Sequence, residues 1–574
     1  MRVVISPTYS DIFEGDVPSL NDLLKDIPSE VVITILSLIN SQLYLGNSIE
    51  TQMRIFEFLS FRQSSETKSK ILSRLIKKSE KEPSIEFFGL LYSTEFIHYE
   101  LVHYRDFQII DTTPDQELNL IKAYFLVAEM VNEKYHSAYK SNESLEAEYF
   151  QKMTWPTLID QFEVNHNINP ITGMVKGLTL LNYLEFHSPY KKYVDSFLLK
   201  NEKKKTWNYI LDLINLVKSS WEAQKNNPNK LSPPAFKESY GFNSLFQNFA
   251  ISIENYTKEY AHDKKNFSGL KDKPLFRLKT ENYIVLNWNF LSNKLYDGLL
   301  FDFFNQSGIS ENKEFKSILD FKNFISNYVI EKFLFKKLIE KCFAKNGVFV
   351  FDDGTKMGFP DAYVRDGKHI FLIEIKDAFF PASSVNSLSY EAIKNTIDQK
   401  YNNEKKGTGQ IIKQLERLKD ATYEQKTFEQ LKLKRRNLSI YPIMIYTDNF
   451  FNLPGINQYL KIELRNKIKV KQLESVFGKI EDLTFVNLSY LIDNIHFLSR
   501  KEFNFKRLIK EYHERIKASE KRLVDQRTIE NLFSVNDPFE SVISNKYSKE
   551  INANKDYVET IVKLLNLTEN LDNG

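Results

Sequence analysis

The chain has 574 residues, which predicts two to four domains, because one hydrophobic core rarely serves a chain of this length. Apolar residues make up 42% and charged residues 27%, which excludes a disordered chain, and a net charge of +3 excludes a uniformly basic nucleic-acid-binding coat. The single cysteine, Cys342, excludes an intramolecular disulfide and a cysteine-based zinc site, as is typical of a reducing compartment.

Neither a secretory leader nor a membrane span is predicted. The first residues contain no apolar segment of the kind that precedes a signal cleavage site. Nowhere does an uninterrupted apolar run reach the length of about 18 residues that a spanning helix needs. We therefore expect a cytoplasmic protein that does not bind a membrane.

Residues 1–225 are predicted to form a helical N-terminal domain. Stretches such as residues 118–139 and 207–221 carry apolar residues at three- and four-residue spacing, which is typical of amphipathic helices. No catalytic motif occurs in this region, so we assign it to sensing, partner binding or nucleic-acid binding. Its lysine clusters at 77–78 and 203–205 are interpreted as solvated surface.

A segment rich in helix-breaking residues follows this helical region. Asparagines and prolines gather at residues 226–234 and predict a domain boundary. We expect a linker and a small β-containing connector over residues 226–313, because residues 275–287 alternate well enough to form a strand or hairpin.

Residues 314–500 are expected to form an α/β domain with a mixed sheet, and residues 501–574 a helical C-terminal region. A long helix should run from residue 314 to about residue 345, where Asn346-Gly347 ends it. The remaining predictions are strands at 348–351, 361–364, 369–376, 439–446 and 483–488, and helices at about 410–422 and 503–518.

The predicted strand at residues 369–376 carries two charged side chains on an otherwise apolar face. Side chains alternate between the faces of a strand, so Glu374 and Lys376 point the same way as Ile370 and Leu372. Two charges in such a setting cost several kcal/mol unless each has a partner. A metal ion with its bound water would supply one of these partners.

A second acid, Asp361, stands at the beginning of the preceding strand. Pro360 before it has no backbone donor and belongs at a strand start. A hairpin turning at Asp366-Gly367 would pair the two strands and let Asp361 and Glu374 face each other. Two carboxylates are the hard oxygen ligands that Mg²⁺ or Mn²⁺ prefers.

A third acid is predicted on the preceding helix. Tyr328, Glu331, Phe335, Leu338 and Cys342 follow three- and four-residue spacing, so Glu331 belongs to a stripe that faces inward. A nearby metal ion would explain an acid on such a stripe.

Pro360-Asp361, twelve intervening residues and Glu374-Ile375-Lys376 together resemble the signature of the PD-(D/E)XK nuclease superfamily. The order helix, three strands, helix, strand resembles the restriction-endonuclease-like core of that family, over roughly residues 321–494. The resemblance implies that Asp361 and Glu374 bind Mg²⁺ or Mn²⁺ with the backbone carbonyl of Ile375, and that Lys376 orients or deprotonates the attacking water.

The same resemblance implies supporting residues on the flanking helices. Glu331 would match the helix acid that some members have, and would then be a further metal ligand. In many members a glutamine on the following helix supports the site. Gln410 and Gln414 share one helix face, and Gln414 looks the better match.

The expected function is a metal-dependent nuclease that acts on DNA in preference to RNA. Nucleases joined to long helical regions resemble bacterial effectors of defence against phage, so a protein activator could bind the N-terminal region. Two alternatives stay open. Glu374 and Lys376 could form a surface pair on an edge strand while Asp361 caps a turn, or a nuclease-like core could serve only to bind nucleic acid or protein.

Overall fold

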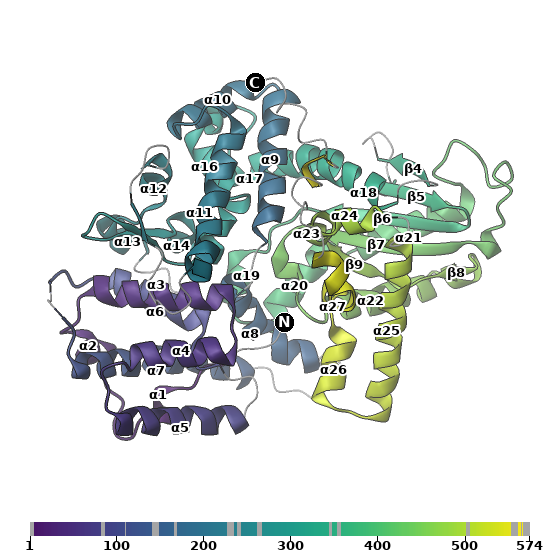
Figure 1. Cartoon of the computed structure of the whole chain (residues 1–574). Helices are drawn as coiled ribbons and strands as arrows, with labels where there is room; N and C mark the ends of the chain where they lie inside the picture. The colour runs from purple at the N-terminus through teal and green to yellow at the C-terminus, as the bar shows by residue number, and fades with distance from the viewer. Residues whose placement is uncertain are drawn as a thin grey trace. The chain divides into compact units, whose positions relative to one another are not determined.

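The structure is a computed structural model of the whole chain, and the residues that it describes form helices and two sheets (Figure 1). It divides into two compact units, one made of residues 2–143 and 156–318 and the other of residues 144–155 and 319–574. The residues that the structure describes are 5–81, 86–108, 111–140, 149–165, 169–226, 235–237, 243–260, 267–343, 347–352, 358–500, 505–552, 561–563 and 565.

The first unit is mainly helical, as the sequence predicts for the N-terminal region. The predicted helices at residues 118–139 and 207–221 lie within α7 and α11, and the division between the units falls at Pro156 inside α8. The helices are α1 (Tyr9–Ile12), α2 (Leu20–Leu24), α3 (Ser29–Leu45), α4 (Ile49–Leu59), α5 (Ser65–Lys81), α6 (Leu90–Val102), α7 (Pro114–Lys140), α8 (Tyr149–Asn165), α9 (Pro170–Phe186), α10 (Lys191–Lys200), α11 (Thr206–Asn226), α12 (Asn243–Phe249), α13 (Ile253–Tyr260), α14 (Ser268–Asp272), α15 (Trp288–Asn293), α16 (Asp297–Gln306) and the 3₁₀ turn η1 (Ile309–Glu311).

A three-stranded antiparallel sheet belongs to this first unit. Its strands β1 (Ala235–Phe236), β2 (Leu275–Arg277) and β3 (Tyr283–Val285) have the order β1-β3-β2. The hairpin expected within residues 275–287 is therefore confirmed. These strands group with the helices instead of forming a separate connector, and residues 227–234 of the expected boundary lie outside the described residues.

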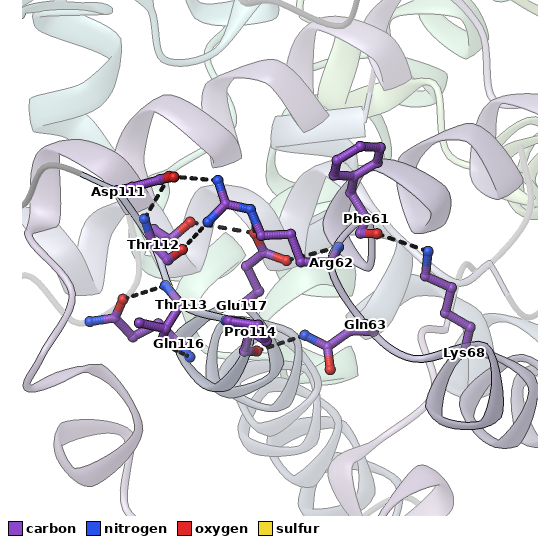
Figure 2. A network of polar contacts seen from close by, with 10 residues as sticks. All are labelled: Phe61, Arg62, Gln63, Lys68, Asp111, Thr112, Thr113, Pro114, Gln116 and Glu117. Atoms are coloured by element: carbon purple, nitrogen blue, oxygen red, sulfur yellow. Dashed lines mark hydrogen bonds and ion pairs between the residues drawn. The ribbon is translucent and has the colours of Figure 1, made fainter.

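A polar network on the surface of the first unit joins the turn after α4 to the beginning of α7 (Figure 2). Arg62 donates from Nη2 to Asp111 Oδ1 at 2.6 Å, and its backbone N–H donates to Glu117 Oε2 at 3.2 Å. Gln63 Nε2 donates to the carbonyl of Pro114 at 2.6 Å. Glu117 lies in the first turn of α7, where the helix dipole also stabilises its negative charge.

The second unit contains a mixed six-stranded sheet, as the sequence predicts. Strands β4, β5 and β6 pair antiparallel, whereas β7 pairs parallel with β6, β8 and β9. The order is β4-β5-β6-β7-β8, with β9 also on β7. The strands are β4 (Val348–Phe351), β5 (Ala362–Asp366), β6 (His369–Lys376), β7 (Ser439–Tyr446), β8 (Lys479–Ile480) and β9 (Thr484–Asn487).

Helices that precede, connect and follow the strands of this sheet complete the second unit. The C-terminal helices belong to the same compact unit as the sheet, whereas the sequence predicts a separate C-terminal region. The helices are α17 (Ile318–Phe324), the π-helix η2 (Ile325–Phe335), α18 (Lys336–Cys342), α19 (Ala382–Asn386), α20 (Tyr390–Tyr401), α21 (Thr408–Asp420), α22 (Ile456–Val470), α23 (Leu488–Asp493), α24 (Ile495–Leu498), α25 (Phe505–Asp525), α26 (Ile529–Asn536) and α27 (Phe539–Asn552), with 3₁₀ turns η3 (Arg435–Asn437), η4 (Asn449–Phe451) and η5 (Leu473–Ser475).

The segment predicted as one regular helix from residue 314 to 345 contains a π-helix at its centre. Its i→i+5 hydrogen bonding widens the turn. Buried side chains accordingly recur at four- and five-residue intervals, as in Ile325, Val329 and Leu334, instead of at three and four. Tyr328, which the regular period places inward, is 42% exposed, so that prediction is wrong.

Two helices, α19 and α20, lie between β6 and α21, where the sequence predicts no helix. In α20 the residues Tyr390, Ile393 and Ile397 are buried, while most positions between them are polar or charged. Among the described residues, no helix has the length and apolar character needed to cross a membrane.

Candidate active site

The pairing of β5 with β6 places the two predicted acids opposite each other. Ala362 pairs with Ile373, so the next position along each strand sets Asp361 against Glu374. The strands turn through Gly367-Lys368, one residue later than the predicted turn at Asp366-Gly367, and Gly367 has a φ of +60°. The backbone N–H of Ile375 donates to Asp361 Oδ2 at 2.7 Å, which holds the carboxyl beside the strand.

Glu374 lies on a central strand, because β6 has β5 on one side and β7 on the other. Its exposed fraction is 0%, whereas the side chain of Asp361 is 23% exposed. The alternative in which Glu374 and Lys376 form a surface pair on an edge strand is therefore contradicted by the structure.

The ammonium group of Lys376 lies between the two acids. Its Nζ is 3.0 Å from Glu374 Oε2 and 3.8 Å from Asp361 Oδ2. Burial by itself would lower the pKa of Lys376, but the two carboxylates raise it above its ordinary value. Lys376 therefore remains protonated at neutral pH.

Burial also changes the pKa values of Glu374 and Asp361. It raises the pKa of Glu374 to about 8, assisted by the charge of Asp361 and opposed by Lys376. It raises the pKa of Asp361 as well, although Lys376 and the N–H of Ile375 act in the opposite direction. The ionised pair therefore lacks sufficient positive charge in its surroundings.

Gln414 on α21 completes the contacts of Glu374. Its Nε2 donates to Glu374 Oε1, so the carboxyl is held from two sides. The Oε1 atom of Gln414 is buried and has no hydrogen-bond partner among the residues that the structure describes. An unsatisfied buried oxygen next to a pair of acids is a place where a further ligand would be stabilised.

Gln410 lies one turn before Gln414 on α21, as predicted, but its side chain bonds the start of its own helix. Helix α21 begins at Thr408, two residues earlier than predicted, so Gln410 lies in its first turn. There its Oε1 accepts a hydrogen bond from the N–H of Gly407 at 3.1 Å. The unpaired N–H groups of a helix start attract such a side chain, so Gln410 caps the helix.

Glu331 lies on the π-helix and is half-buried. Burial raises its pKa to about 8, and the charge of Asp361 contributes to this shift. No hydrogen bond reaches Glu331 from any residue that the structure describes. Glu331 thus lies close enough to Asp361 to respond to its charge, while its place as a metal ligand stays a prediction.

A second buried ion pair, which the sequence analysis missed, adjoins the site. The carboxylate of Asp377 contacts the ammonium of Lys322 on α17, and Ser326 Oγ donates to its Oδ2 at 2.8 Å. Thr447 Oγ1 donates to its Oδ1. Burial alone would raise the pKa of Asp377, but Lys322 and these hydroxyls hold it below its ordinary value.

Asp377 therefore ties the helix that carries Glu331 to the end of the strand that carries Lys376. The contact between Asp377 and Thr447 could have been predicted from the sequence. Asp377 and Thr447 each directly follow a predicted strand, and Lys376 pairs with Tyr446 in the parallel ladder. Polar residues that follow neighbouring parallel strands lie at the same edge of the sheet.

The oxygen atoms at this site have the chemistry that a hard divalent cation prefers. Asp361 and Glu374 supply carboxylates, and the carbonyl of Ile375 lies on the Asp361 side of its strand, because its N–H points there. The raised pKa values and the unsatisfied Gln414 oxygen fit the binding of a cation by these residues. Within the described part of the chain, however, no three Asp, Glu, His or Cys side chains already gather as a metal-binding group.

No protein-family model, no curated protein and no solved structure matches this chain. The functional assignment therefore depends on the geometry and electrostatics of the residues themselves.

Proposed function

We propose that this chain is a Mg²⁺- or Mn²⁺-dependent nuclease that hydrolyses phosphodiester bonds, with DNA as its preferred substrate. The observation that carries the proposal is the fully buried Glu374, opposite Asp361 on a central strand, with the ammonium of Lys376 between them. Charges are rarely retained in such a place without a function, because burying them is costly.

Asp361, Glu374 and the Ile375 carbonyl would hold the divalent ion. When bound, the ion supplies Lewis-acid polarisation of a phosphate oxygen and lowers the pKa of a coordinated water. Gln414 fixes the rotamer of Glu374 through its amide. Because the two carboxylates raise the pKa of Lys376, this residue stabilises developing negative charge and orients the water as a donor, in preference to acting as the base.

We also propose that the first unit senses a signal or binds an activator, as in a bacterial effector of defence against phage. Its support is that this unit is compact by itself and consists mainly of helices. Expression in bacteria challenged with phage tests this part. Equal plaque counts with the active protein and with Asp361→Asn would contradict it.

Cleavage by the purified full chain tests the nuclease. Plasmid DNA, linear DNA and RNA are incubated with Mg²⁺, Mn²⁺ or EDTA, and products are separated on gels. We expect cleavage of DNA that requires a divalent ion and is lost in Asp361→Asn and Lys376→Met. A matched control is Asp366→Asn, which changes an acid at the other end of β5, beside Lys506.

Two results would count against the nuclease. Cleavage that persists in Asp361→Asn would show that another site or a contaminant is responsible. Binding of nucleic acid without cleavage in either ion would identify a non-catalytic binding module built on the same fold.

A further inference from the structure

An exposed arginine stands on α21 one turn beyond the glutamine that contacts Glu374. Arg417 follows Gln414 by three residues, so the two side chains lie on neighbouring parts of one helix face. The guanidinium of Arg417 lies over the ring of Phe359, 4.3 Å from its centroid, and 5.6 Å from that of Tyr423. Two aromatic rings therefore hold this cation.

The same rings connect Arg417 to the acidic pair. Phe359 precedes Asp361 by two residues, and its ring packs edge-on against Tyr423 with centroids 5.0 Å apart. Tyr423 donates from its hydroxyl to the carbonyl of Gln414 at 3.0 Å. Burial raises the pKa of Tyr423, with Arg417 opposing and Glu374 adding to the shift, so both charges act on one hydroxyl.

Arg417 is thus a second cation linked to the acidic pair, and it is exposed, whereas Lys376 is largely buried. A planar guanidinium matches the oxygens of a phosphate in a bidentate way, which an ammonium does not. A guanidinium already held against a ring loses less side-chain freedom when it binds an anion.

We propose that Arg417, positioned by Phe359 and Tyr423, binds a backbone phosphate of the nucleic-acid strand next to the bond that is cut. Arg417 is thus a substrate-positioning residue, and the inference rests on the proposed nuclease function. Arg417 contacts a phosphate and not the edge of a base. The contact therefore contributes affinity without sequence preference.

The test measures binding without cleavage. The full chain carrying Asp361→Asn is titrated against a fluorescent DNA duplex, and separately against a fluorescent RNA, in Mg²⁺ at several NaCl concentrations, with anisotropy as the readout. Adding Arg417→Gln should weaken binding by about tenfold or more, because a charge-assisted contact is lost. The slope of log K against log[salt] should also become shallower by about one, since one fewer phosphate is neutralised.

A matched control is Lys419→Gln on the same helix. Successive residues of a helix turn by about 100°, so Lys419, which is also exposed, points away from Arg417. The DNA affinity of the Lys419→Gln variant and the salt dependence of that affinity should equal those of the parent. In the active chain, Arg417→Gln should raise KM and leave kcat unchanged, which separates a binding contact from a loss of folding.

The outcomes separate this inference from the function on which it rests. If the parent binds DNA and Arg417→Gln matches it in affinity and salt slope, the assignment of Arg417 is wrong and the nuclease stands. If Lys419→Gln loses as much as Arg417→Gln, the effect is a general charge effect and the assignment is also wrong. If the parent binds neither DNA nor RNA, the proposed nuclease itself fails.

Discussion

Two charged networks of this protein differ in their surroundings. The network of Figure 2 joins Arg62, Asp111 and Glu117 on the surface of the first unit, where the side chain of Asp111 is 67% exposed. The network of the candidate site joins Asp361, Glu374 and Lys376, and Glu374 is fully buried. Both contain ion pairs with similar distances between their charged atoms.

The difference lies in what each network does to the acids it contains. Exposed Asp111 beside Arg62 has a pKa below its ordinary value, because a nearby cation favours the charged form. Glu374 also contacts a cation, Lys376, at 3.0 Å, yet burial and Asp361 raise the pKa of Glu374 to about 8. Water stabilises the first network, whereas the second needs a further positive charge. Similar contacts therefore have a local structural role in one place and support the proposed function in the other.

Glu374→Gln gives the largest expected effect in this comparison. The substitution keeps the shape of the side chain and removes the charge. Divalent-ion-dependent cleavage should fall by about a thousandfold or more, because the ion loses a ligand. Stability to urea should stay equal or increase, since burying a carboxyl that lacks compensation is unfavourable. Loss of stability in parallel with activity would show that Glu374 only supports the fold.

Lys322→Met tests the buried pair beside the site. It leaves Asp377 without its cation inside the protein, which should lower the free energy of unfolding by about 3–5 kcal/mol. Lys322→Met with Asp377→Asn removes both charges and should recover part of that loss. Urea denaturation of the two variants and of Asp377→Asn measures the coupling. If Lys322→Met is as stable as the native chain, the buried carboxylate of Asp377 does not need Lys322 as its partner.

A pH titration of stability tests a buried acid of the same unit outside the site. Glu540 on α27 accepts hydrogen bonds from Tyr446 and from the N–H of Asn487, and burial raises its pKa to about 7 from 4.5. Between these values the folded state binds more protons than the unfolded state. Stability should therefore fall as the pH rises from about 4.5 to 7, by roughly 3 kcal/mol from this group.

Glu540→Gln is the matched variant for this titration. It cannot ionise, so the difference in unfolding free energy between the native chain and the variant should change across that pH range and be constant above and below it. A constant difference at every pH would mean that Glu540 titrates at its ordinary pKa in the folded protein.

Arg62→Ala should have the smallest effect, because the partners of Arg62 remain hydrated when it is removed. We expect a shift of the thermal midpoint of about 1 °C or less, and one that shrinks further in high salt. Differential scanning calorimetry at two NaCl concentrations measures it. A shift as large as that of Lys322→Met would remove the distinction between the two networks.

Parts of the candidate site follow from short-range sequence features. The bounds of β4, β6 and β7 agree with the predicted strands at 348–351, 369–376 and 439–446. Alternation along the chain places Asp361 and Glu374 on the same face of the sheet, but the turn lies one residue later than predicted, and its actual position sets Asp361 opposite Glu374. Gln414 is implied by the family resemblance, and its amide contacts Glu374 in the structure.

Other parts depend on contacts between distant segments. The π-helix, the capping position of Gln410 and the Lys322–Asp377 pair were not predicted. A regular helical period fails at residues 325–335, where buried side chains recur at wider intervals. The C-terminal helices also belong with the sheet, as the contact of Glu540 with Asn487 illustrates.

The sequence by itself determined most of the strands, the hairpin between β5 and β6, and the residue types at the acidic pair. It determined these because side-chain alternation and turn chemistry act over a few residues. Only the tertiary structure decided which charges share a buried volume, and therefore which acids have raised pKa values. Burial and its electrostatic consequences depend on packing between segments that lie far apart in the chain.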